Sequence, residues 1–133
     1  MLMTVLLLAA VAAPSEYQEH HCDSPMSQMD MNICAGLDFE AADAELNTLW
    51  KKVIADAREA DREVDREYDK RPSSEDVLRQ AQRSWIQYRD AHCTFEGYES
   101  RGGSMEAMLY NFCRAQVTRE RIAQLQTPDA DSK

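Results

Sequence analysis

The stretch from Glu40 to Arg71 contains neither glycine nor proline, and no other feature constrains the fold of the chain as strongly. Apolar side chains recur along it every three or four residues, which is the spacing of one face of an α-helix. The stretch therefore predicts a long amphipathic helix, about 48 Å in length if unbroken. Its apolar face comprises Leu46, Trp50, Val53, Ala57, Ala60, Val64 and Tyr68.

The second half of this stretch, residues 56–70, is densely charged. Acidic residues stand three positions before and after a basic column that consists of Arg58, Arg62, Arg66 and Lys70. Each such pair stabilises an exposed helix by about 0.2–0.5 kcal/mol. The pattern predicts a solvated, self-supporting helix, with a charged docking face as the alternative.

Two further helices are expected after Pro72, which ends the long helix because the residue before a proline avoids helical geometry. Ser73 or Ser74 is the predicted N-cap of the first, and Ser104 that of the second, after a glycine-containing loop over residues 94–103. Their expected apolar faces are Val77, Ala81, Trp85, Tyr88 and His92 in the first helix, and Met105, Leu109, Phe112, Ala115 and Ile122 in the second.

A short helix over residues 27–37, with Gly36 as a joint, is expected before the long one. No run alternates apolar and polar residues as a half-buried strand does. The predicted fold is therefore all-α: a small antiparallel helical bundle with one long helix, a helical hairpin and a short N-terminal helix. It occupies residues 20–126 as a single domain, followed by a flexible tail over residues 127–133.

The first residues of the chain predict export. Residues 2–13 form an uncharged apolar run that ends in small residues, and it is shorter than the ~20 residues of a transmembrane helix. This predicts a signal peptide over residues 1–13, cleaved near residues 12–14, and a periplasmic or secreted protein. A buried N-terminal helix is the alternative. Because no cysteine directly follows the run, we expect no stable membrane anchor after cleavage.

The four cysteines, Cys22, Cys34, Cys93 and Cys113, make an even number, for which an oxidising compartment favours disulfides. A glycine-rich turn between antiparallel helices has enough slack to join Cys93 to Cys113, which would leave Cys22 to pair with Cys34. Pairing of Cys22 or Cys34 with a cysteine of the hairpin stays open, since spacing does not determine connectivity.

Metal binding through His20, His21 and His92 is a weaker alternative to disulfide formation. These histidines stand beside Cys22 and Cys93, but the pairs lack the spacing of zinc sites. The sequence therefore predicts no metal and no cofactor.

The net charge of the chain argues against some classes of binding partner. The chain has 15 Lys and Arg residues against 24 Asp and Glu residues, a formal net charge of −9. A nucleic-acid binder needs a basic surface to displace counterions from phosphates, and an anionic membrane attracts basic segments. We therefore expect no nucleic-acid partner.

Several motifs resemble one family of proteins. They are ADAELN at residues 42–47, QRSWIQYRDAHC at residues 82–93, GGS at residues 102–104, and then Cys113 with Thr118 and Arg121. This series resembles the LprI-type lysozyme inhibitor family of bacterial envelope proteins, over residues 22–125. The resemblance implies a small helical, disulfide-bonded envelope domain, and the best-known member inhibits lysozyme. The chain departs from that member in lacking a lipidation cysteine and in its charged residues 56–70.

The motif residues predict a structural polar network. Trp85 is expected to anchor the core, while Arg89 and Asp90 meet Asp43 and Asn47 beside the apolar face. Charges near a core persist when they are paired, so these residues are expected to fix the register of the helices. A binding role is the alternative.

No arrangement of catalytic residues is evident in the sequence. It shows no phosphate-binding loop, no hydroxyl–imidazole–carboxylate series and no metal-ligand spacing, and His92 beside Cys93 is better explained by a disulfide. The chain is therefore predicted not to be an enzyme.

Inhibition of lysozyme would require a binding element, for which the loop around residues 95–104 is the candidate. Tyr98 supplies an aromatic anchor, Ser100 and Ser104 supply hydrogen-bond donors, and Arg101 supplies a cation. The expected partner is a basic lysozyme whose cleft receives this loop. The alternative is an envelope scaffold or stress-response adaptor that binds another envelope protein through the charged long helix.

Overall fold

The computed structural model describes residues 20–126. Over this range the regular structure is entirely helical, which confirms the all-α prediction. The elements are α2 (Gln28–Arg62), α3 (Ser74–Gly97), the short 3₁₀ helix η1 (Tyr98–Ser100) and α4 (Glu106–Leu125). The predicted signal peptide and the predicted tail over residues 127–133 lie outside the described residues.

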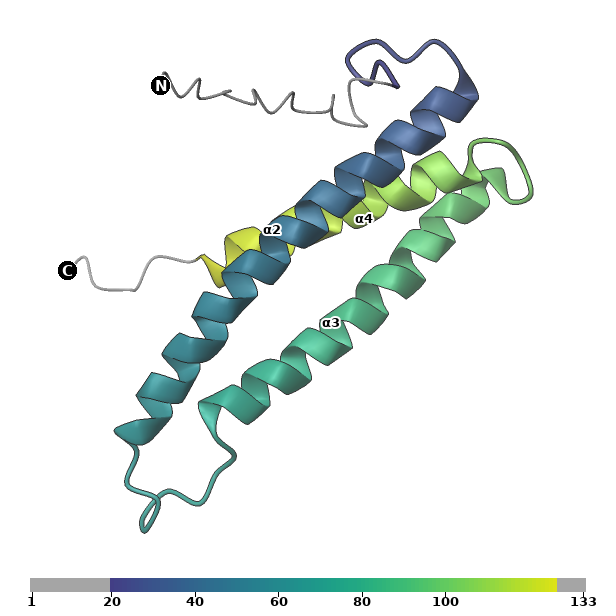
Figure 1. Cartoon of the computed structure of the whole chain (residues 1–133). Helices are drawn as coiled ribbons and strands as arrows, with labels where there is room; N and C mark the ends of the chain where they lie inside the picture. The colour runs from purple at the N-terminus through teal and green to yellow at the C-terminus, as the bar shows by residue number, and fades with distance from the viewer. Residues whose placement is uncertain (1–19, 127–133) are drawn as a thin grey trace, which may run out of the picture.

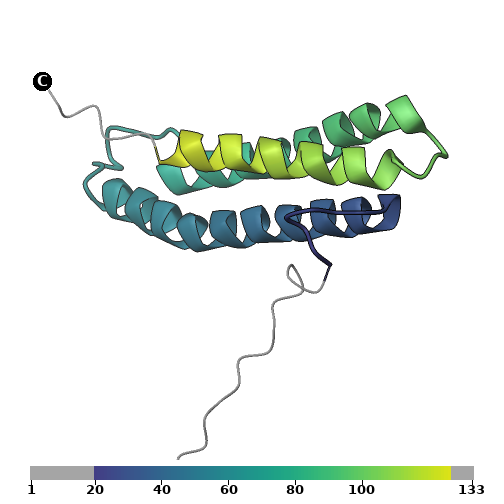
Figure 2. The ribbon, with the colours of Figure 1, turned by 90° about the horizontal axis from the view of Figure 1, so that it is seen from above.

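The three α-helices form an elongated bundle (Figures 1 and 2). Helix α3 runs antiparallel to α2, and α4 returns along both of them, so that α3 and α4 make the predicted hairpin. The connection 63–73 lies at one end of the bundle and the turn 101–105 at the other. No helix within the described range combines the length and the apolar character that a membrane crossing requires.

Small side chains dominate the buried interior. Ala35 and Ala42 of α2 and Ala115 of α4 are at most 1% exposed. Because these side chains are short, the backbones of α2 and α4 can approach closely along this stretch. The larger buried apolar side chains are Leu46, Ile54 and Ile122.

The predicted short helix over residues 27–37 is not a separate element. Helix α2 begins at Gln28 and continues through Gly36 without a break. Ser27 caps it, since its hydroxyl accepts a 3.0 Å hydrogen bond from the backbone N–H of Asp30. A glycine costs a helix about 1 kcal/mol relative to alanine. Packing of this segment on α4, which buries Ala35 completely, outweighs that cost.

The long helix ends earlier than predicted. Helix α2 stops at Arg62, and residues 63–73 form turns rather than two further helical turns, so the basic column does not continue to Lys70. Two contacts with the next helix explain the difference. Asp61 accepts hydrogen bonds from the start of α3, and Arg58 forms a bidentate pair with Glu75 at 2.8 and 2.9 Å. These tertiary contacts outweigh the weak pairs within a solvated helix.

The buried face of α3 differs from the predicted one. Val77 and Tyr88 are 53% and 57% exposed, and Ala81 is exposed as well. The buried residues are instead Arg89, Cys93 and Gly97. An arginine therefore occupies the inner face, where an apolar pattern cannot indicate it. Ser73 is the N-cap, as predicted, and accepts from the backbone N–H of Asp76.

Helix α4 begins at Glu106, with Met105 in the N-cap position, so the predicted N-cap role of Ser104 is wrong. The backbone carbonyl of Ser104 instead accepts a 2.9 Å hydrogen bond from the side-chain amide of Asn32 in α2. Met105 and Phe112, expected in the apolar face, are 42% and 51% exposed. Ala115 and Ile122 are buried as expected.

Candidate functional site

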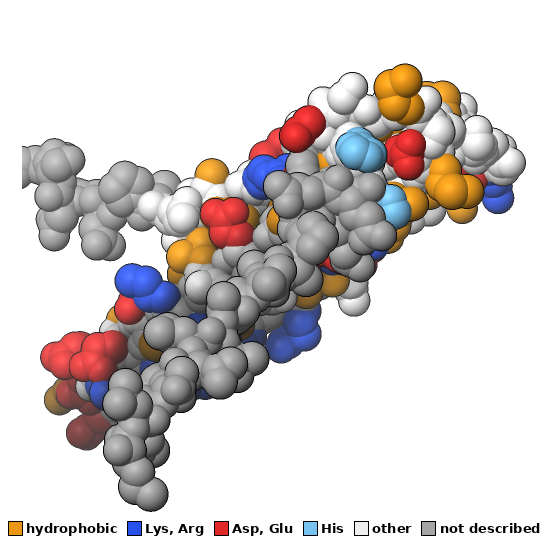
Figure 3. Space-filling model, turned by 45° about the horizontal axis from the view of Figure 1, so that its top comes forward, with side chains coloured by type: hydrophobic (Ala, Val, Ile, Leu, Met, Phe, Trp, Pro, Cys, Tyr) orange, Lys and Arg blue, Asp and Glu red, His pale blue; other side chains and the backbone are white. Residues whose placement is uncertain are grey.

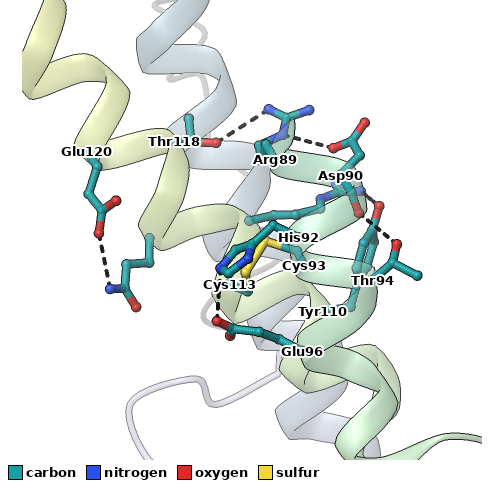
Figure 4. Close-up of a disulfide and its surroundings, with 12 residues drawn as sticks. Arg89, Asp90, His92, Cys93, Thr94, Glu96, Tyr110, Cys113, Thr118 and Glu120 are labelled. Carbon is teal, nitrogen blue, oxygen red and sulfur yellow. Dashed lines mark hydrogen bonds and ion pairs between the residues drawn. A yellow bond between two sulfur atoms is a disulfide. The ribbon is translucent and has the colours of Figure 1, made fainter. Parts of the chain in front are cut away.

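Two disulfides secure the same end of the bundle. Cys93 of α3 is bonded to Cys113 of α4, and Cys22 is bonded to Cys34 of α2. These are the pairs that the sequence favours, and the alternative pairing between the N-terminal segment and the hairpin does not form. The Cys93–Cys113 disulfide is buried between α3 and α4, one helical turn from where α3 ends (Figure 4). It therefore fixes the two helices that carry the turn between them.

The loop between α3 and α4 is shorter and more ordered than expected. Helix α3 extends to Gly97, and η1 follows directly, which leaves residues 101–105 as the turn. Gly102 adopts a φ of 75°, which glycine accommodates without strain. A Cβ on Gly103 would lie 3.0 Å from the carbonyl oxygen of Ser100. The backbone conformation thus favours glycine at position 102, and the close carbonyl oxygen favours it at position 103.

The four predicted partner-binding residues lie together in this region. The guanidinium of Arg101 stacks over the ring of Tyr98 at 4.3 Å, and both side chains are exposed. Ser100 and Ser104 border an open hollow of about 350 Å³, together with Arg101. Among the described residues, neither serine hydroxyl has a hydrogen-bond partner. The loop therefore presents a cation on an aromatic ring beside two free donors.

Several large apolar side chains are exposed at this end of the bundle. Met29, Phe95, Tyr98 and Met105 are between 42% and 73% exposed, and hydrophobic side chains are visible at this end in Figure 3. The hydrogen bond from Asn32 to Ser104 holds the start of α2 against the turn. Exposed aromatic and methionine side chains are typical of protein-binding surfaces. We call these four side chains, with Arg101, the loop-end patch.

The five residues of the predicted polar network also meet. Arg89, only 7% exposed, donates to Asp90 at 2.9 Å and to Asp43 at 3.4 Å. Its guanidinium lies 5.0 Å from the ring of Trp85, and Asn47 donates to Asp43. Arg89 also contacts the hydroxyl of Thr118, which is fully buried in α4 (Figure 4). The network thus joins all three helices.

Sequence reasoning missed an extension of this network along α4. Arg114 lies 3.4 Å from the ring centre of Phe39, and Arg89 lies over the same ring at 5.1 Å. Farther along α4, Arg121 lies over Trp85 at 5.9 Å. Arg114 and Arg121 are seven residues apart, so they share one face of α4. That spacing, together with the aromatic residues on the facing helices, is the signal that could have indicated these contacts.

Three residues of metal-binding types meet near the disulfide, but one of them is not free to bind a metal. His92, Glu96 and Cys113 bring their ligand atoms within 4.8 Å of one another, and His92 pairs with Glu96 at 3.1 Å (Figure 4). The sulfur of Cys113 is committed to the disulfide, so it cannot act as a thiolate ligand or nucleophile. The geometry therefore offers a histidine–glutamate pair on the surface of α3.

The fold is that of a small helical domain, in which two disulfides fix the end of a bundle that exposes an apolar, arginine-containing loop. The chain belongs to the LprI family: the family described as lysozyme inhibitor LprI matches residues 20–125. An uncharacterized protein of Rhizobium meliloti is 43% identical over 126 residues, which cover 92% of this chain and 88% of that protein. The comparison with solved structures found no match.

Proposed function

We propose that this chain is an exported inhibitor of lysozyme that acts by binding and catalyses no reaction itself. Its membership of the lysozyme inhibitor LprI family supports this role. The apolar run at residues 2–13 supports export to the compartment in which disulfides form.

The observation that carries the proposal is the stacking of Arg101 on Tyr98 at the exposed end of a disulfide-fixed hairpin. A side chain held in position before binding loses less entropy when the complex forms. Tyrosine and arginine are also among the residue types enriched at the positions that dominate the energy of protein interfaces.

The chemistry of the loop is complementary to the cleft of a glycosidase. Lysozymes cleave glycosidic bonds with two carboxyl groups in a cleft. We propose that the guanidinium of Arg101 lies against these carboxylates, while Ser100 and Ser104 donate hydrogen bonds in place of the sugar hydroxyls. The net charge of −9 would steer the chain toward a basic lysozyme before the loop makes contact.

The test measures hydrolysis of peptidoglycan by lysozyme with increasing amounts of the purified, disulfide-bonded protein. We expect inhibition that weakens about thirtyfold in Arg101→Ala, because a desolvated cation is worth about 2 kcal/mol at an interface. Helicity and thermal midpoint should stay unchanged, since an exposed loop residue contributes little to stability. Arg83→Ala is the matched control, because Arg83 is an exposed arginine on α3 with no ion pair among the described residues.

The absence of inhibition by the wild-type protein would contradict the proposal. The alternative, an envelope scaffold or adaptor, would then be favoured if the protein captured an envelope partner through the exposed side of α2. That side carries the Lys52–Asp56 pair, whose side chains are 74% and 62% exposed.

A further inference from the structure

One cavity lies far from the loop-end patch, at the other end of the bundle. It has a volume of about 760 Å³, is open to solvent on one side, and is bordered by the connection 63–73, the start of α3 and the last turn of α4. Cavities of about 300–1,000 Å³ are typical of small-molecule sites. The apolar part of its lining is aliphatic: Val64, Pro72, Val77, Leu78, Ala81 and Leu125.

The acidic groups in this lining already have partners. Asp61 accepts hydrogen bonds from the backbone N–H groups of Ser74 and Glu75. Asp69 is bound by the guanidinium and the backbone N–H of Arg71. Neither carboxylate is therefore free to take up an arginine on the opposite wall.

Arg121 is the cation on that opposite wall. Its Nε donates to Gln82 at 3.0 Å and its Nη1 to Gln124 at 3.2 Å, so two neutral amides hold the guanidinium in place. Within the part of the chain that the structure describes, no carboxylate lies within 4.0 Å of it. Burial lowers the pKa of Arg121, as expected for a cation whose surroundings are apolar and uncompensated. An arginine stays protonated in proteins, so this site retains its positive charge.

We propose that the cavity binds a small amphipathic monocarboxylate, such as a medium-chain fatty acid. The carboxylate pairs with Arg121, and the alkyl chain lies on Val77, Leu78 and Leu125. This site is separate from the lysozyme-binding surface, and the proposal does not depend on that function.

Three features of the lining favour this class of ligand. The partly buried guanidinium of Arg121 matches one carboxylate, because such a pair forms strong charge-assisted hydrogen bonds. The aliphatic lining, which has no aromatic ring, suits a flexible alkyl chain better than a flat ring system. Asp61 and Asp69 line the same cavity together with Arg66 and Arg71, so the charges of these four residues balance and the positive charge of Arg121 matches a ligand with one negative charge.

The test is calorimetric titration of the full, disulfide-bonded chain with decanoate, below the concentration at which the probe forms micelles. We expect Arg121→Gln to weaken binding at least about tenfold through loss of a charge-assisted bond. Arg83→Gln, on an exposed part of α3, should bind as the wild type does. Decanol, which has the same chain but no charge, should bind at least about tenfold more weakly than decanoate.

A second pair of variants avoids any effect of Arg121 on folding. Val77 is 53% exposed and lines the cavity, so its replacement leaves the core intact. Val77→Asp should weaken decanoate binding much more than the equally sized Val77→Asn, because only the former adds a negative charge. Circular dichroism would verify that both variants keep the helical fold.

Three results would overturn the proposal. The first is no binding of decanoate, and the second is equal binding of decanoate and decanol. The third is an affinity of Arg121→Gln for decanoate equal to that of the wild type.

Discussion

The carboxylate of Asp61, in the last turns of α2, accepts a 2.7 Å hydrogen bond from the backbone N–H of Ser74, the first residue of α3. Its other oxygen accepts from the N–H of Glu75 at 3.0 Å. A residue thirteen positions away thus satisfies two of the N–H groups that every helix leaves unpaired at its start. Together with the Arg58–Glu75 pair, this contact fixes the corner between α2 and α3.

Asp61→Asn is expected to lower the thermal midpoint by about 4 °C at pH 7, because it removes the negative charge that caps α3. The hydrogen bonds from Glu75 and Ser74 lower the pKa of Asp61 in the folded protein. A carboxyl group with a lowered folded-state pKa stabilises above its unfolded pKa, near pH 4, and this contribution is lost as the pH falls through the folded value. Calorimetric scans at pH 7 and pH 2.5 should therefore show the difference between variant and wild type shrinking in acid.

Asp56→Asn is the control for this experiment, since Asp56 forms only an exposed pair with Lys52 on α2. Its effect should be much smaller at both pH values. Equal midpoints for wild type and Asp61→Asn at pH 7 would show that the negative charge of the cap contributes nothing.

Arg89→Met is expected to destabilise the protein by about 2–3 kcal/mol in urea unfolding. The change leaves Asp43 and Asp90 without their shared cation and removes the stacking on Trp85. The penalty stays below that of a fully buried pair because both carboxylates are 40–45% exposed. Arg89→Lys should recover less than half of the loss, since lysine lacks the planar fork that contacts several partners.

Arg83→Met is the matched control on the exposed side of α3 and should leave the free energy of unfolding within about 0.5 kcal/mol of the wild type. If the Arg89 variant behaved like this control, the network would not fix the packing of the helices.

Helix formation itself was predictable from local patterns, whereas helix ends and faces depended on contacts between distant residues. Ser73 and the proline before it locate the start of α3 correctly. The end of α2 is set by Asp61 and Arg58, whose partners lie on α3, and no local rule indicates those partners. The inner face of α3 was misjudged because its central residue, Arg89, is polar and becomes buried only when three helices satisfy it.

The candidate site shows the same division. The residue types of the loop, and the association of Trp85, Arg89 and Asp43, followed from the motifs. The stacking of Arg114 on Phe39 did not, because it pairs residues of α4 and α2 whose facing sides are known only from the packed bundle. The cavity beside Arg121 was likewise unpredictable, since it exists only because α2 ends at Arg62 and the chain folds back.

Removal of the Cys93–Cys113 disulfide by a double alanine substitution is expected to cost about 3 kcal/mol by the loop-entropy model. Removal of Cys22–Cys34, which closes a shorter loop, should cost slightly less. Urea unfolding measures both losses. Inhibition of lysozyme should distinguish the two variants. Only loss of Cys93–Cys113 frees the two helices that carry the turn, so only that variant should also lose inhibition. Equal inhibition by both would show that the turn does not need this disulfide.

Reversing the charge of two acidic residues tests whether the net charge of the chain speeds its association with lysozyme, separately from the contacts that the loop makes in the complex. Glu63 and Glu67 are exposed residues of the connection 63–73, at the opposite end of the bundle from Arg101. Glu63→Lys with Glu67→Lys changes the net charge from −9 to −5. This change should slow association with a basic lysozyme and flatten the salt dependence of the association rate, while dissociation stays unchanged. Surface plasmon resonance at two salt concentrations measures both rates.

Loss of the loop contacts should instead change the dissociation rate and leave the association rate nearly unchanged. In the Arg101→Ala, Tyr98→Ala double variant, the long-range field is nearly intact, so association should change little. Dissociation should be faster, because contacts made only in the complex determine how long it lasts. Two results together would contradict the proposed mechanism. The double variant would inhibit as well as the wild type, and the charge-reversed variant would lose inhibition. The binding surface would then be the charged side of the bundle, and the loop would be only a turn between α3 and α4.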